Sequence, residues 1–181
     1  MKYFPQGESS GDEYASLTTA QRKALNRKFS RNFKAYHKQL DKLKRRISPQ
    51  AWKFFALGFG DTGLHDARLL TFSAGDDLNF AVDRNQASKA RKHKTEVRIL
   101  ILNRKQTHLY SFVCAEIRKF LFNYPVQDPR WNWHQIDLLE TYELTSVNKR
   151  YLSLELLFSS NTTLLVEFGQ LRYKRQRLLP G

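Results

Sequence analysis

The chain of 181 residues is 41% hydrophobic and 13% aromatic, and it carries a formal net charge of +14. This length predicts one domain that buries about 70% of its surface on folding, and no apolar run reaches the roughly 18 residues of a membrane span. The single cysteine, Cys114, excludes a disulfide framework and a cysteine-rich metal site, and we expect it to be a small buried hydrophobe.

The N-terminus combines glycine, serine and acidic residues without any periodicity. We therefore predict a mobile lead-in over residues 1–16 and a single α+β domain over residues 17–181. Because the lead-in lacks the apolar stretch of a signal peptide, the sequence predicts a cytoplasmic protein.

A long amphipathic helix is predicted over Thr18–Ile47. Thr18 and Gln21 match the capping-box pattern at its start, and Pro49 prevents its continuation. At about 100° per residue, the large apolar side chains fall within an arc of about 80°, which is typical of a face packed on a sheet. These side chains are Leu25, Phe29, Phe33, Tyr36, Leu40, Leu43 and Ile47.

A short second helix is expected directly afterwards. Ser48 is suited to be its N-cap, Pro49 its first residue and Gly58 its C-terminal stop. The two helices together would occupy residues 18–57.

From Leu64 onward the apolar residues recur mostly with period two, which predicts strands. Short connections favour antiparallel neighbours, so we expect a largely meander sheet of about seven strands over residues 64–175, covered by the two helices. Ala74-Gly-Asp-Asp77 predicts a hairpin. The sequence leaves open whether the sheet closes into a barrel. The expected strands are 67–73, 78–83, 96–102, 107–115, 117–123, 138–144, 150–158 and 163–168, with a short edge strand at 171–174.

Positive charge is concentrated on the long helix, where residues 18–53 contain twelve basic side chains and one acidic side chain, Asp41. Five like-charge pairs at i,i+4 spacing oppose this helix by about 0.2–0.5 kcal/mol each, and only Asp41 and Arg45 pair opposite charges at that spacing. We interpret the basic face as a surface for an acidic protein, nucleic acid or anionic lipid, with solubility alone as the alternative. The candidate residues are Lys23, Arg27, Arg31, Lys34, Lys38, Lys42 and Arg45.

Two further clusters of positive charge follow. A polar loop carries Lys89, Arg91, Lys92 and Lys94, and it either extends the basic face or is an ordinary charged hairpin loop. The second cluster lies in the tail, over residues 172–177.

His65 and Asp66 form a pair that is found in metal-dependent phosphohydrolases. Because the following residues predict a strand, a structural role is the main interpretation, and a hydrolase that uses this pair is the alternative. Trp131 and Trp133 could likewise offer stacking surfaces for bases, or close one end of the sheet. We expect no metal site and no cofactor, and no site for a small-molecule substrate is evident.

Four segments together carry a resemblance to a known class of proteins. They are Gly63-Leu-His-Asp-Ala-Arg-Leu-Leu, the Gly75-Asp-Asp hairpin, Phe120-Leu-Phe and Leu164-Leu-Val-Glu-Phe. Over residues 60–175 the chain resembles small bacterial proteins of unknown function, which open an antiparallel sheet with a His-Asp-(Ala/Ser) segment. Some of these are immunity proteins of polymorphic toxin systems. The resemblance implies a bacterial α+β protein that binds a partner and has no known catalytic activity.

Positive charge is concentrated on one helix face and two clusters, and the sequence shows no catalytic motif. Together these features predict a non-catalytic binding protein whose partner is an acidic macromolecule. The alternative is a nucleic-acid-binding protein that contacts the phosphate backbone.

Overall fold

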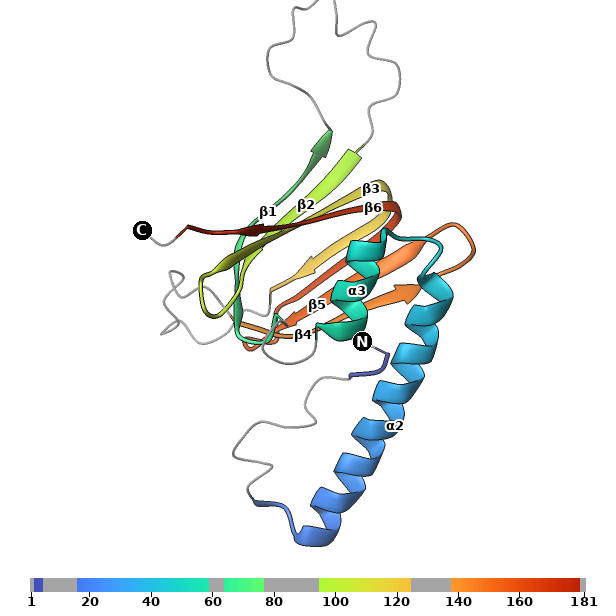
Figure 1. The fold of residues 1–181 in the computed structure, drawn as a ribbon, viewed down its shortest axis with the longest axis vertical. Coiled ribbons are helices and arrows are strands. Elements are labelled where there is room, and N and C mark those ends of the chain that lie inside the picture. The colour runs from blue at the N-terminus through green and yellow to red at the C-terminus, as the bar shows by residue number, and fades with distance from the viewer. Residues whose placement is uncertain (1, 5–15, 59–63, 77–94, 125–137, 180–181) are drawn as a thin grey trace, which may run out of the picture.

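A computed structural model describes residues 2–4, 16–58, 64–76, 95–124 and 138–179 (Figure 1). Two helices precede six strands. They are α2 (Thr19–Leu43), α3 (Pro49–Leu57), β1 (Ala67–Asp76), β2 (Thr95–Leu102), β3 (His108–Asn123), β4 (Leu138–Ser146), β5 (Leu152–Phe158) and β6 (Thr163–Arg177).

The predicted α+β architecture with an antiparallel, largely meander sheet is confirmed. The strands form a closed barrel in the order β1-β2-β3-β6-β5-β4. Closure depends on a short contact, in which Ala67 and Arg68 of β1 pair with Leu139 and Leu138 of β4.

The nine expected segments correspond to six described strands. β3 unites 107–115 with 117–123, β6 unites 163–168 with 171–174, and 78–83 lies outside the described residues. β3 continues through Glu116, which adopts a left-handed φ of 57°, and its register against β6 shifts between Ile117 and Lys119. β6 continues through Gly169, where a Cβ atom would collide with the side chain of Glu116. The irregularity bends the β3–β6 ribbon without ending either strand.

The hairpin predicted at residues 74–77 is wrong. β1 runs on through Gly75 to Asp76 and pairs with Thr95, Glu96 and Val97 of β2. A Gly-Asp sequence favours a turn only locally, and here the cross-strand pairing with β2 extends the strand. The strand expected at 78–83 lies outside the described residues.

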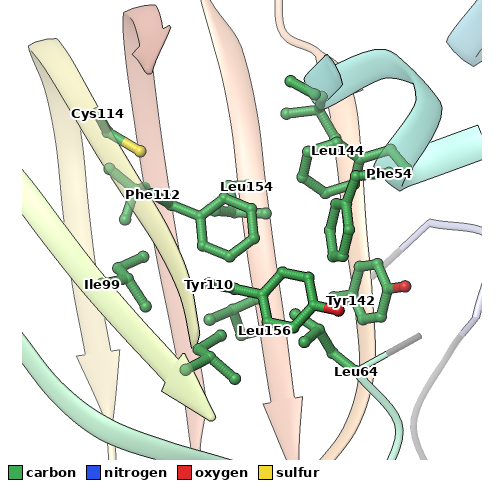
Figure 2. Close-up of a cluster of buried hydrophobic side chains, with 14 of the residues drawn as sticks. Phe54, Leu64, Ile99, Tyr110, Phe112, Cys114, Tyr142, Leu144, Leu154 and Leu156 are labelled. Atoms are coloured by element: carbon green, nitrogen blue, oxygen red, sulfur yellow. The ribbon is translucent and has the colours of Figure 1, made fainter. Parts of the chain in front are cut away.

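Helix α3 packs its buried face, with Phe54 and Phe55, against the interior of the barrel. The Phe54 ring stacks on Tyr142 at a centroid distance of 5.5 Å and lies 5.5 Å from Phe112 and 5.1 Å from Tyr173. Figure 2 shows Phe54 reaching from α3 toward Tyr110 and Tyr142, with Cys114 on the side of the cluster away from α3. Cys114 is fully buried, which raises the pKa of its thiol and confirms the prediction of a buried hydrophobe.

Both helices begin at their predicted caps. Thr18 and Gln21 form the capping box of α2, and Ser48 caps α3 with Pro49 in its first turn. Helix α2, however, ends at Leu43 and not at Ile47. The next residues form a turn, from which the Arg46 guanidinium donates hydrogen bonds to Ser146 Oγ and Asn148 O, both at 2.8 Å.

The apolar stripe of α2 covers the barrel only along its C-terminal half. Tyr36, Leu40 and Leu43 are buried, and Tyr36 Oη accepts a hydrogen bond from the Leu144 amide of β4 at 3.0 Å. Phe29 is 55% exposed, because the N-terminal half of α2 extends past the end of the barrel (Figure 1).

Residues 2–4, at the start of the predicted lead-in, contact β4 and α2. The amides of Lys2, Tyr3 and Phe4 donate to the carboxylate of Glu143 at 2.9, 2.8 and 2.6 Å, and Glu143 is only 1% exposed. Asn32 of α2 donates to Tyr3 O at 3.0 Å. We call residues 2–4 the N-terminal strap, since they join α2 to β4.

Candidate binding surface on helix α2

Seven predicted site residues form one row along α2 and the turn that follows it. The steps between them average about 3.7 residues, close to one helical turn, so the row runs nearly parallel to the helix axis over about 33 Å. All seven side chains are exposed. This basic row consists of Lys23, Arg27, Arg31, Lys34, Lys38, Lys42 and Arg45.

No described acidic side chain neutralises the basic row. Within the described parts of the chain, none of its seven side chains forms an ion pair, although buried and half-exposed carboxylates elsewhere do. The spacing of Asp41 and Arg45 would allow an ion pair on a continuous helix, but Arg45 lies in the turn after Leu43 and no such pair forms. Among the described residues, the row is therefore a line of positive charge without ion-pair partners.

Part of the basic row borders a hollow in the molecular surface. Its described lining consists of Asn26, Arg27, Ser30, Arg31 and Lys34. Guanidinium and ammonium donors thus stand beside an amide and a hydroxyl, a combination suited to carboxylate or phosphate oxygens. Most of its described lining belongs to the N-terminal half of α2, which extends beyond the barrel (Figure 1).

The His65–Asp66 pair holds a turn in place. Asp66 has a left-handed φ of 60°, and its amide donates to Leu139 O at 2.9 Å, where β1 meets β4. Its two carboxylate oxygens contact His65 Nδ1 at 3.1 Å and Arg104 Nη1 at 2.8 Å. The described residues contain no group of three potential metal ligands. This geometry favours the structural role for the pair.

The remaining predicted candidates lie outside the described residues. They are Lys89, Arg91, Lys92 and Lys94 of the basic loop, with Trp131 and Trp133. Their position relative to the basic row therefore stays a prediction. Neither helix in the described parts of the chain is long and apolar enough to span a membrane.

Sequence reasoning missed two polar features. The first is Glu143, which looks like one more alternating residue of β4 but binds the N-terminal strap. The second is the C-terminal half of β6, where the sequence showed the charge cluster and a short edge strand but not a strand that continues to Arg177. The alternation of Leu171 and Tyr173 with Arg172 and Lys174 was the available signal.

Comparison of the chain with models of protein families, with characterised proteins and with solved structures gave no significant match. The resemblance to small bacterial proteins and immunity proteins therefore stays a prediction from the sequence.

Proposed function

We propose that this chain is a non-catalytic binding protein that engages an acidic macromolecular partner through the basic row of α2. The observation that carries the proposal is the line of seven exposed cations without ion pairs among the described residues. Like charges at this spacing destabilise the helix that carries them by about 0.2–0.5 kcal/mol per pair, so solubility alone accounts poorly for their alignment.

The partner we favour presents a linear arrangement of carboxylates. Cations that recur once per helical turn lie about 5.5 Å apart, which is also the spacing of acidic residues at i,i+3 and i,i+4 on a partner helix. An acidic helix lying along α2 could thus pair most of the row at once. Rapid, salt-dependent association is expected from such a field.

The test is capture of a partner by immobilised protein at low salt, followed by titration calorimetry with that partner. A triple charge reversal, Arg27→Glu with Arg31→Glu and Lys34→Glu, is expected to abolish binding. The matched control reverses three exposed cations away from the basic row: Lys105, Lys119 and Lys149. Both variants change the net charge equally, so loss of binding in both, or in neither, would contradict the proposal.

Direct binding to nucleic acid is a second candidate, favoured by the length of the basic row. Its span of about 33 Å is close to one turn of B-DNA. A gel-shift series with a DNA duplex decides between the two, because six phosphate contacts would give a log–log salt slope of about −5. A flat response to salt, or no shift at low salt, removes this candidate.

A further inference from the structure

Within the described parts of the chain, the C-terminal half of β6 has a neighbouring strand on one side only. β3 pairs with β6 over its whole length, from Thr163 to Arg177, whereas β5 pairs only with residues 163–168. From Gly169 onward no described residue pairs with the second edge of β6. In Figure 1 this half of β6, drawn in dark red, runs beside β3 and away from β5.

The unpaired backbone groups on this edge can be assigned from one hydrogen bond. The Leu178 amide donates to Thr107 O at 2.8 Å, and the register of β6 against β3 is unbroken from there to Leu171. Because the two sides of an antiparallel strand alternate, even-numbered residues of this segment face β3 and odd-numbered residues face the open edge. Each odd-numbered residue offers one N–H donor and one C=O acceptor there. These residues are Leu171, Tyr173, Arg175 and Arg177.

The same edge is strongly cationic. Arg172 contacts the carboxylate of Glu96 on β2, and Arg175 hydrogen-bonds the Tyr110 side chain. Lys174, Arg175 and Arg177 form no ion pair with a described residue. Their side chains project on both faces of the strand and are exposed. Like charges directly across a strand pair destabilise it, so two copies of this edge would repel one another.

We propose that the open edge of β6 binds an extended acidic peptide, which adds to the barrel as a further antiparallel strand. The four outward backbone donors and acceptors would hold the peptide main chain, and its carboxylates would lie opposite Lys174, Arg175 and Arg177. Charge thus disfavours a second copy of this chain and favours an acidic strand. This site is separate from the basic row and needs an extended partner.

The probe is a synthetic peptide of alternating glutamate and valine. Fluorescence anisotropy of the labelled peptide measures its binding, and hydrogen exchange of the protein amides shows which residues the peptide protects. Strand addition predicts an odd–even pattern. The amides of Leu171, Tyr173, Arg175 and Arg177 gain protection, whereas those of even-numbered residues, already paired with β3, change little. Uniform protection along β6, or none, overturns the proposal.

Two control peptides separate backbone pairing from charge attraction. A version with a central proline lacks one main-chain donor, and a version with lysine in place of glutamate reverses the charge. Each is expected to bind at least about tenfold more weakly. Equal binding of the proline peptide means that charge alone attracts it, which contradicts strand addition.

Variants of the protein complete the test. Arg175→Pro removes an outward N–H and leaves the pairing with β3 intact, so it should weaken peptide binding by about tenfold or more. If the proline variant fails to fold, the double variant Arg175→Glu with Arg177→Glu serves instead. It should also weaken peptide binding, and it leaves the backbone donors unchanged. The triple reversal on α2 should leave binding unchanged. The proposal is wrong if the α2 triple reversal loses peptide binding while the β6 variants keep it. It is also wrong if the odd–even protection appears without peptide when the protein dimerises.

Discussion

Replacement of Glu143 by alanine is expected to release the N-terminal strap. Three main-chain amides converge on this buried carboxylate. Hydrogen bonds to a charged acceptor contribute about 1.5–3 kcal/mol each, whereas ordering three residues costs about 3–6 kcal/mol. The strap also places Tyr3 against Tyr36 and Phe4 against Phe29. The balance gives a loss of about 2–3 kcal/mol in the free energy of unfolding.

Two further variants refine this expectation. Glu143→Gln keeps the shape of the side chain but replaces one acceptor oxygen with an amide donor, so at least one hydrogen bond to the strap is lost. It should lower the free energy of unfolding by about 1 kcal/mol, which is less than the loss for alanine. Glu140→Ala on the same strand is the control, because Glu140 is exposed. It should change stability by no more than about 0.5 kcal/mol.

Urea unfolding measures the global effect, and hydrogen exchange resolved by mass spectrometry reports on residues 2–4. The reasoning would be refuted if Glu143→Ala matched Glu140→Ala in stability. It would also be refuted if the strap amides exchanged equally fast with and without the Glu143 carboxylate.

Three other predictions concern the core and the helix cap. Phe54→Ala should lower the free energy of unfolding by about 3–5 kcal/mol, measured by urea titration, because the ring fills the barrel interior. Thr18→Ala should cost about 1 kcal/mol through loss of the α2 cap, seen as faster exchange in the first turn alone. Burial raises the pKa of Tyr36 and Tyr142 in the folded state, so unfolded tyrosine ionises first and stability should fall above about pH 10. A free energy of unfolding that stays constant as the pH rises from about 9 to about 11 would contradict this last prediction.

Local signals were sufficient to predict the helix starts and most strands. Thr18, Ser48 and Gly58 act within one turn of the chain, so their caps could be predicted without knowledge of the fold. Period-two alternation likewise located β2 and β5 to within two residues. These features depend on nearest neighbours, which the sequence displays directly.

Features set by distant contacts could not be predicted in the same way. The turn expected at Gly75 became strand because β2 continues to pair beyond it. The apolar stripe of α2 predicted a covered face but not how far the barrel would extend beneath Phe29. For the candidate site, the sequence predicted the row of cations, whereas the absence of ion pairs to it among the described residues required the fold.

The half of α2 that overhangs the barrel should become more stable as salt is added. It carries the like-charge pairs Lys23–Arg27 and Arg27–Arg31 without the packing that supports Tyr36 and Leu40. Relief of two pairs is worth about 0.4–1 kcal/mol, so amide protection in residues 24–30 should rise about two- to fivefold between about 0.01 M and 1 M salt. Arg27→Gln, which removes both repulsions, should lose most of that gain.

Amide hydrogen exchange in residues 36–43 is the internal control. In this part of α2, contacts with the barrel rather than charge repulsion limit local unfolding of the helix. Equal salt effects in both halves, or an undiminished effect in Arg27→Gln, would show that repulsion along the basic row does not govern the overhang. If the effect is confined to the overhang, a polyanion bound to the row would stabilise it further, since binding to the folded helix shifts its equilibrium by mass action. The row would then act both as the binding surface and as the source of the strain that binding relieves.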